Sequence, residues 1–182
     1  PTLCHLSLPD IKMVNQSASC RVCMVEVVGR RVLAPACATP VSAGMEVLTH
    51  TPRTINARRT VVELILSNHP KNCLTCPKNT SCELQSLAAE LSIHDITYSG
   101  AMAQHKRDAS SPAFVKEMSK CVLCSRCDTM CNQVQTVNVL SGINRGFETT
   151  VGPPSHMPMV DTTCVACGQC ASVSPTAALF DV

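Results

Sequence analysis

The chain has 182 residues, a formal net charge of +2 and 14 cysteines, but only one Tyr, three Phe and no Trp. Its 15 basic and 13 acidic residues are well mixed, so nucleic-acid binding has little support. No uninterrupted apolar stretch of about 18 residues occurs, and we therefore predict no membrane span. Because large aromatic side chains normally dominate core burial, metal–thiolate bonds are the expected substitute in this interior.

The first 50 residues favour β structure. Short strands are expected within 21–28, 31–37 and 45–49, because these stretches are apolar and rich in β-branched residues. Four cysteines punctuate the segment, and the middle two form a C-x2-C pair: Cys4, Cys20, Cys23 and Cys37. A pair with one cysteine on each side is the layout of a 2Fe–2S loop, although the plant-type spacing puts four residues before the pair.

From Thr51 the pattern becomes helical. Thr51 is a plausible N-cap with Pro52 at the first helical position, and the helix should end near Asn68 because His69 precedes a proline. A second helix is expected to run as far as Leu91. Its predicted start is a capping box of Thr80 and Glu83, with Cys82 in the first turn.

A second group of candidate ligands lies between these helices: His69, Cys73, Cys76 and Cys82. A histidine near a helix end is more often a surface residue or a cap. Here three cysteines have no fourth cysteine nearby, and a 4Fe–4S cubane needs four ligands, which favours His69 as the fourth. The other five histidines lack such surroundings and are interpreted as structural or solvated: His5, His50, His94, His105 and His156.

Beyond a small, polar segment at 99–118, interpreted as a linker or an ordered surface loop, the sequence contains an internal repeat. CVLCSRCDTMC (121–131) and CVACGQCASVS (164–174) match cysteine for cysteine except at the last position, where Cys131 is replaced by Ser174. Each half should be a loop of three ligands followed by a short helix that carries the fourth.

In two-cluster ferredoxins the fourth ligand of each run serves the other cluster. One predicted site therefore consists of Cys164, Cys167, Cys170 and Cys131, and the other of Cys121, Cys124, Cys127 and Ser174. The second site is one thiolate short. Serine oxygen ligation, a 3Fe–4S cluster and a lost cluster are the open alternatives, and the near-isosteric serine favours a retained 4Fe–4S cluster.

Disulfide bonds and structural zinc would each account for many cysteines, but both fit this sequence less well. Disulfide-rich chains are typically small secreted domains, whereas these cysteines occur in tight C-x2-C groups and no signal peptide is visible. A structural zinc site prefers two C-x2-C pairs, while runs of three cysteines at three-residue steps suit a cubane better.

The order of these motifs resembles the N-terminal iron–sulfur electron-relay part of an iron-only (FeFe) hydrogenase large subunit, of the NAD(P)-linked or electron-bifurcating type. The resemblance rests on PTLCH, CRVCMVEV, NHPKNCLTCPKN, CELQ, NRGF and CGQC, and covers essentially the whole chain. Similar modules occur in the large subunit of NADH dehydrogenase and in some NAD-linked formate dehydrogenases. A stand-alone electron carrier is a further alternative.

The resemblance implies an α+β fold in four parts. These are a β-grasp 2Fe–2S ferredoxin-like domain that lacks its N-terminal part (1–50), a small helical 4Fe–4S domain with one histidine and three cysteine ligands (51–98), a linker (99–118) and a two-cluster ferredoxin-like domain (119–182). It also implies one 2Fe–2S and three 4Fe–4S clusters. The chain itself holds no substrate-converting site.

The expected function is electron transfer between a hydrogen-activating site outside this chain and NAD(P) or ferredoxin partners. Expected partners are flavin/NAD(P)-binding and 2Fe–2S carrier subunits and a C-terminal hydrogenase domain, and a cytoplasmic location is expected.

Overall fold

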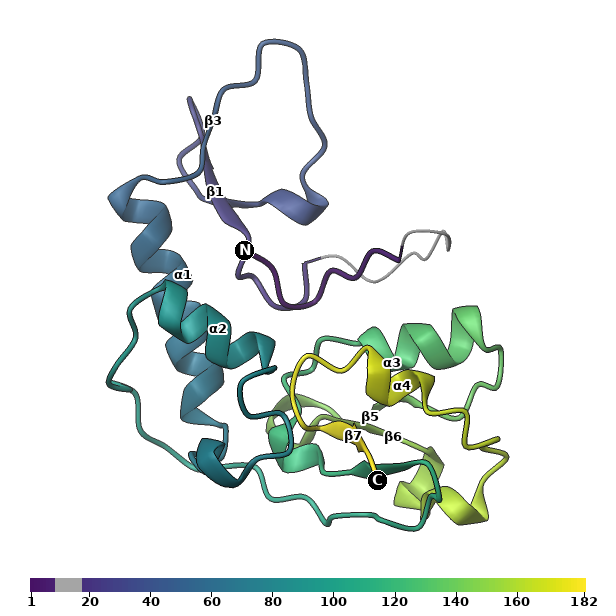
Figure 1. The fold of residues 1–182 in the computed structure, drawn as a ribbon. Helices are drawn as coiled ribbons and strands as arrows, with labels where there is room; N and C mark the ends of the chain where they lie inside the picture. Colours follow the sequence, from purple (N-terminus) through teal and green to yellow (C-terminus); the bar gives the residue numbers. More distant parts are fainter. Residues whose placement is uncertain (9–17) are drawn as a thin grey trace.

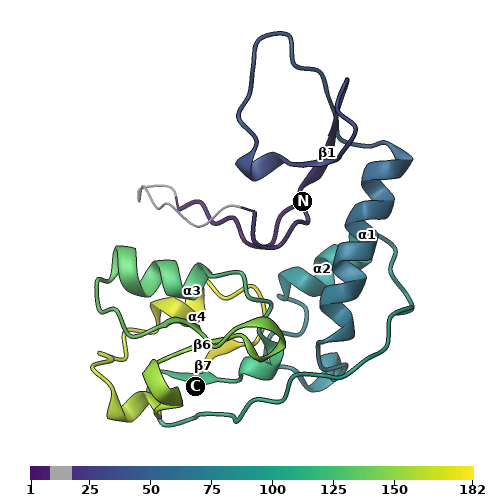
Figure 2. The same ribbon diagram turned by 180° about the vertical axis from the view of Figure 1, so that it is seen from behind.

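The computed structural model describes residues 1–8 and 18–182 and has a mixed α and β fold. A small β segment lies above two helices, α1 and α2, and a C-terminal lobe of short strands and short helices lies beside them (Figure 1). The view from behind shows the first residues of the chain running between these parts (Figure 2). Within the described residues, no helix is both long enough and apolar enough to cross a membrane.

The N-terminal sheet has three antiparallel strands in the order β2-β1-β3. They are β1 (Met24–Val27), β2 (Ala34–Pro35) and β3 (Val47–Leu48). Each lies inside one of the predicted stretches but is shorter. Gly29 at φ 82° turns the chain after β1, and Pro35 ends β2 because it has no N–H to donate. A 3₁₀ turn at Ala36–Ala38 follows and carries Cys37.

Helix α1 (Pro52–Ser67) begins and ends where the sequence predicts. The Thr51 hydroxyl accepts a hydrogen bond from the Thr54 N–H at 3.2 Å, and Asn68 is the C-cap. The buried face of the helix lies against the sheet. One contact between them is the hydrogen bond that the Arg58 Nε donates to the Met24 carbonyl at 3.0 Å. The helix thereby supports the strand that follows the Cys20–Cys23 pair.

Helix α2 (Glu83–Glu90) begins later than predicted. Cys82 is its N-cap, and the proposed capping box of Thr80 and Glu83 is wrong. Thr80 has a left-handed backbone (φ 70°), and its N–H donates to the side-chain oxygen of Gln85 at 3.1 Å. The start of the helix is therefore set by Gln85 reaching back from its first turn.

The C-terminal lobe contains two antiparallel strand pairs. These are β4 (Phe114–Lys116) with β7 (Leu179–Asp181), and β5 (Ser141–Ile143) with β6 (Thr150–Gly152). Strand β4 is buried along its whole length and lies inside the segment interpreted as a linker. Its pairing with the far end of the chain, Val115 with Phe180, explains why local sequence alone did not indicate it.

Two short helices carry the cysteine runs of this lobe: α3 (Arg126–Thr129) and α4 (Gln169–Ser172). Helix α3 continues into a π-helical turn at Met130–Val134, which holds Cys131. The remaining elements are 3₁₀ turns at Cys73–Thr75, Met118–Lys120, Gly146–Glu148, Pro154–His156 and Met159–Asp161.

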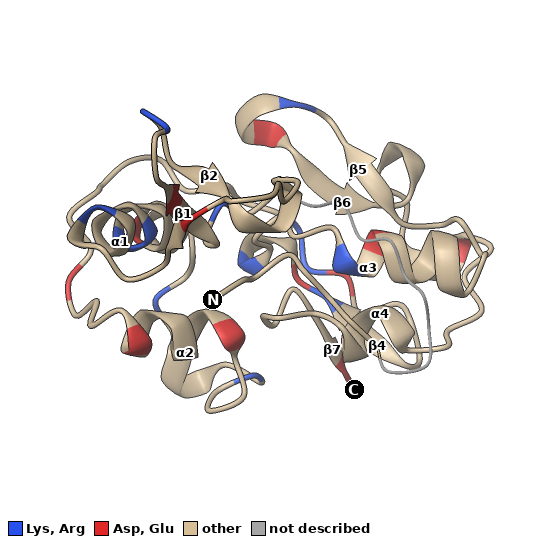
Figure 3. Ribbon diagram, turned by 90° about the horizontal axis from the view of Figure 1, so that it is seen from above, with Lys and Arg blue, Asp and Glu red and all other residues tan. Residues whose placement is uncertain are grey.

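The buried side chains of residues 1–8 and 18–182 form two apolar cores that include cysteines. One fills the C-terminal lobe around Phe114, Leu140 and Leu179. The other joins the first residues of the chain to both long helices and to the C-terminal lobe, through Leu3, Cys4, Cys20, Val22, Val62, Leu84, Leu87, Leu91 and Cys124. Acidic and basic residues are distributed over all parts of the ribbon seen from above (Figure 3).

Candidate iron–sulfur sites

The four cysteines of the N-terminal segment lie together although residues far apart in the chain supply them. The Sγ atoms of Cys23 and Cys37 are 3.4 Å apart. The side chains of Cys4 and Cys20 are hydrogen-bonded, and Cys4 is also close enough to Cys37 to raise its pKa electrostatically. The structure thus brings together all four predicted ligands of the 2Fe–2S site.

Backbone amides surround these sulfurs. The Ala18 N–H donates to the Cys37 Sγ at 3.1 Å. Burial alone would raise the pKa of Cys20, but N–H groups of Val22, Leu3 and Cys4 outweigh burial and lower it. Donors of this kind stabilise the thiolate, which is the form that binds iron.

The second group of ligands lines a single cavity beneath α1 and α2. His69, Cys73, Cys76 and Cys82 all contribute to its wall, together with apolar residues such as Leu66 and Leu84. Cys82 occupies the N-cap of α2, and the N–H groups of Leu84 and Gln85 donate to its sulfur. Cys82 therefore lies at the N-terminus of the helix, but at the N-cap and not in the first turn, where the sequence predicted it.

His69 fits a ligand role on two observations. The residue is 9% exposed, and its Nδ1 atom has no hydrogen-bond partner among the described residues. Burial, and then the nearby charge of Lys120, lower the pKa of His69 to about 4. The imidazole is therefore neutral near pH 7, and the neutral imidazole is the form that coordinates metals.

The two cysteine runs of the C-terminal lobe share their backbone conformation through the first three cysteines and the short helix, and differ afterwards, where Cys131 lies in a π-helical turn and Ser174 lies beyond the end of α4. Leu123 and Ala166 stand at equivalent positions with φ of 52° and 51°, and Ser125 and Gly168 do so with φ of 58° and 71°. Left-handed residues in such loops turn successive N–H groups inward, where they face negative charge. One of these groups is the Leu123 N–H, which donates to the Cys121 Sγ at 3.4 Å. The sequence repeat is thus also a structural repeat.

The crossed pairing of the two runs agrees with the positions of the thiols. Cys170 lies near Cys167, Cys164 and Cys131, all of which act electrostatically on its pKa. The same four cysteines line an apolar cavity walled by Phe114, Leu140 and Met159. The structure thus brings a fourth thiol, from the other run, beside this trio.

The remaining trio also gathers: Cys127 lies near Cys121 and Cys124. Ser174 is buried at 8% exposure, but its hydroxyl donates to the Thr176 carbonyl at 2.8 Å. Within the part of the chain that the structure describes, no hydrogen bond joins this hydroxyl to a sulfur of the trio. Ligation by Ser174 would therefore have to replace an existing hydrogen bond.

Burial dominates the titration of Cys124, Cys127 and Cys170 in this lobe. It raises the pKa of Cys124 and of Cys170 to about 12, and that of Cys127 well above its ordinary value. These three thiols are protonated near neutral pH unless a metal replaces the proton, so iron binding to them releases protons. Among the described residues, no group of three or more His, Cys, Asp or Glu is arranged to hold a single metal ion.

Two charged residues near the sites were not singled out from the sequence. Lys120, 4% exposed, lies close enough to His69 to influence its pKa and forms an ion pair with Glu117 at 3.2 Å. Arg126 lies between two candidate ligands in the chain and pairs with Glu83. Their importance depends on contacts between distant segments, for which local sequence patterns carry no signal.

Two family models match the first half of the chain. Residues 2–52 match a 2Fe-2S iron-sulfur cluster binding domain, and residues 58–97 match the NADH-ubiquinone oxidoreductase-G iron-sulfur binding region. The chain is 53% identical over 181 residues to the NADP-reducing hydrogenase subunit HndD of Solidesulfovibrio fructosivorans, covering 100% of this chain and 31% of that protein. It is 34% identical over 183 residues to the G 2 subunit of the NADH-quinone oxidoreductase of Rhizobium meliloti, covering 99% of this chain and 20% of that protein.

A solved structure has the same fold. The crystal structure of an NAD+-reducing [NiFe]-hydrogenase in the H2-reduced state aligns with a TM-score of 0.82 and 27% identity, covering 90% of this chain and 69% of that one. Fold and candidate sites together define an iron–sulfur electron-transfer protein. Over 99–100% of its length the chain is similar to part of a hydrogenase subunit and part of a G-type subunit of an NADH-quinone oxidoreductase. The predicted resemblance to a hydrogenase relay is confirmed, and the chain spans less than a third of the length of the curated relatives named here.

Proposed function

We propose that this chain is the electron relay of a hydrogenase subunit that exchanges electrons between a hydrogen-activating site elsewhere in the protein and an NAD(P)- or ferredoxin-linked partner. The single observation that supports this most is the 53% identity to a NADP-reducing hydrogenase subunit along the full length of the chain. A relay module of an NADH or formate dehydrogenase is the second candidate, because the match at 58–97 is to the NADH-ubiquinone oxidoreductase-G iron–sulfur region.

In this proposal four ligand sets hold one 2Fe–2S and three 4Fe–4S clusters. The 2Fe–2S set is Cys4, Cys20, Cys23 and Cys37, and the histidine set is His69, Cys73, Cys76 and Cys82. The two sets of the C-terminal lobe are Cys131, Cys164, Cys167 and Cys170, and Cys121, Cys124, Cys127 and Ser174. When bound there, such clusters supply one-electron redox centres. The chain holds them in place, keeps water away from them and sets their potentials through ligand type, amide hydrogen bonds and burial.

The proposal is tested on the full-length subunit, matured anaerobically. It should evolve hydrogen from a reduced viologen dye, and the Cys82→Ala variant should slow electron delivery to the physiological partner because one relay site is lost. A matured protein with full iron content that evolves no hydrogen would exclude the hydrogenase assignment. It would leave the dehydrogenase relay as the function, which cluster reduction by NADH would then establish.

Ser174 is tested separately by iron content. The proposed ligand sets predict about fourteen irons for this segment, from three cubanes and one 2Fe–2S site. If Ser174 is the fourth ligand, Ser174→Ala should lower the iron content or change the EPR spectrum of one cluster, while Ser174→Cys should keep the iron content unchanged.

Two outcomes would show that Ser174 is not a cluster ligand. A native content of roughly ten irons that rises by about four in Ser174→Cys would show that the serine leaves the site empty. An Ala variant with native iron and an unchanged spectrum would show that the hydroxyl only donates to the Thr176 carbonyl, as in the structure.

A further inference from the structure

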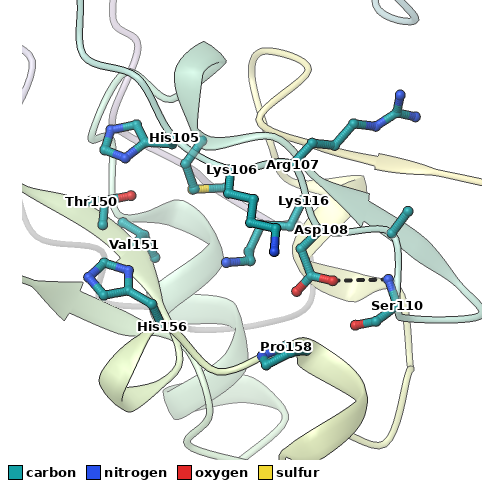
Figure 4. A pocket seen from close by; sticks show the side chains of 12 residues that line it. His105, Lys106, Arg107, Asp108, Ser110, Lys116, Thr150, Val151, His156 and Pro158 are labelled. Carbon is teal, nitrogen blue, oxygen red and sulfur yellow. Dashed lines mark hydrogen bonds between the residues drawn. The ribbon is translucent and has the colours of Figure 1, made fainter.

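A cavity of about 420 Å³ opens in the C-terminal lobe, lined by none of the candidate cluster ligands. Its walls come from the segment 105–110, from β4 and from the β6 region. Figure 4 shows the Lys106 and Lys116 side chains extending into its centre, with His105 and His156 on one side and Asp108 on the other. The volume lies in the range of about 300–1,000 Å³ that is usual for small-molecule sites.

Lys116 is a largely buried residue whose ammonium faces the cavity and has no bonded partner among the described residues (Figure 4). The residue is only 7% exposed, and its ammonium forms no hydrogen bond or ion pair with any residue that the structure describes. Burial lowers its pKa, and only the more distant charge of Asp108 acts in the opposite direction. An ammonium at the wall of a cavity, with no ion pair of its own, favours a bound anion, because a charged hydrogen bond to it is among the stronger ones.

Thr150 adds a second unpartnered polar group to the same wall. It is 2% exposed, and its Oγ1 has no hydrogen-bond partner among the described residues. Buried hydroxyls are normally hydrogen-bonded, and an exception calls for an explanation such as an unseen ligand. The hydroxyl can donate to an oxygen of an anion held by the lysines.

Asp108 does not neutralise the cavity. Its Oδ1 accepts from the Ser110 N–H and its Oδ2 from the Met159 N–H, both at 2.9 Å, so both oxygens are already engaged. Its single charge faces the two lysine ammoniums of Lys106 and Lys116. Arg107 points away and lies over the Phe180 ring, 5.9 Å from its centroid (Figure 4).

We propose that this cavity binds the phosphate group of a small molecule, with Lys106, Lys116 and Thr150 donating to the phosphate oxygens. A phosphate group carries close to two negative charges near neutral pH and several acceptor oxygens, which matches two ammoniums and one hydroxyl. The cavity has more space than one phosphate requires, and the imidazoles of His105 and His156 lie where an organic substituent would extend. The site is separate from electron transfer and adds a binding function to the relay.

The test uses the anaerobic, cluster-loaded full-length subunit and isothermal titration calorimetry with inorganic phosphate and with AMP, at constant ionic strength. One saturable site is expected. Lys116→Met and Lys106→Met should each weaken binding by about tenfold, the usual effect of losing a charged hydrogen bond worth roughly 1.4 kcal/mol. AMP binding tighter than phosphate identifies an organic phosphate as the ligand, and equal binding identifies free phosphate.

Two further variants separate loss of phosphate binding from loss of the fold and from a general effect of charge. Thr150→Val has nearly the same shape and removes a hydroxyl without a partner, so the fold should tolerate it while phosphate binding weakens. Arg30→Met removes an exposed charge in the N-terminal segment and should leave binding unchanged. The proposal is overturned if neither phosphate nor AMP binds saturably, or if Arg30→Met weakens binding as much as the lysine variants do.

Discussion

At the scale of single residues, Lys120 is a charged group that acts on the histidine of a candidate cluster site. It is buried, its charge lowers the pKa of His69, and its carbonyl accepts the Thr176 hydroxyl at 2.7 Å. A buried charge is screened far less than an exposed one. Lys120 should therefore favour the reduced, more negative state of whatever redox centre His69 helps to hold.

We predict that Lys120→Met lowers the reduction potential of the histidine-ligated cluster. The shift should be on the order of tens of millivolts, since about 59 mV corresponds to a tenfold change in a one-electron equilibrium. EPR-monitored redox titration measures it. Lys71→Met is the matched control, because Lys71 is exposed, lies two residues from His69, and its charge is screened by water. An equal shift in both variants would show that burial of the charge is not what matters.

At the scale of the elements, α1 is the support on which the N-terminal sheet rests. Its N-cap does two things at once: the Thr51 hydroxyl accepts from the Thr54 N–H and donates to the Glu26 carboxylate at 2.8 Å. Glu26 belongs to β1, the strand that follows the Cys20–Cys23 pair. Loss of the cap should therefore loosen both the helix and the strand.

Thr51→Ala should lower stability by about 1 kcal/mol, the usual cost of removing an N-cap side chain. It should also speed loss of the 2Fe–2S cluster, because β1 loses a contact to the helix. Anaerobic thermal denaturation followed by visible absorbance measures both effects. Thr60→Ala, at an exposed position inside the same helix, should be neutral or slightly stabilising, because Ala has the higher helix propensity. Faster cluster loss in Thr60→Ala would contradict this explanation.

Local sequence patterns predicted some of these elements and failed at others. Thr51, Pro52 and Asn68 predicted α1 to within a residue, because caps are set by neighbours in the chain. The same logic failed at Thr80, where a left-handed backbone and the Gln85 side chain replace the expected capping box. The crossed grouping of Cys131 with Cys170 was predictable because the repeated cysteine run follows the pattern of two-cluster ferredoxins, in which the fourth ligand of one run serves the other cluster.

At the scale of the whole molecule, the decisive contacts join segments that no local pattern connects. Strand β4 pairs with the far end of the chain, and the cavity that holds Lys116 and Thr150 forms only when three segments meet. His105 and His156, which the sequence suggested were structural or solvated, lie on its wall. Such features depend on tertiary packing, so sequence periodicity could not predict them.

Arg126 is the residue that ties the three parts of the molecule together. Its guanidinium binds both carboxylate oxygens of Glu83, at the start of α2, at 2.5 and 2.8 Å. It also donates to the His5 carbonyl at 3.1 Å, and the Glu83 N–H in turn donates to the Pro175 carbonyl at 3.0 Å. The Arg126 side chain is 5% exposed and that of Glu83 is 44% exposed, so the two ends of the pair differ greatly in their access to water.

This asymmetry leads to a prediction about the two single variants. Glu83→Ala leaves a buried guanidinium without its carboxylate, whereas Arg126→Met leaves a half-exposed carboxylate that water can hydrate and a side chain that can pack. Breaking a buried pair by removing one partner is most damaging when the remaining charge stays buried. Glu83→Ala should therefore accelerate loss of the clusters in urea more than Arg126→Met does. The double variant should resemble Arg126→Met.

The measurement is the rate of bleaching of the visible iron–sulfur absorbance under anaerobic conditions, since unfolding of a cluster protein is not reversible. If Arg126→Met is the more damaging change, the role of Arg126 lies in its link to His5 and its place beside Cys124 and Cys127, and the ion pair with Glu83 is secondary.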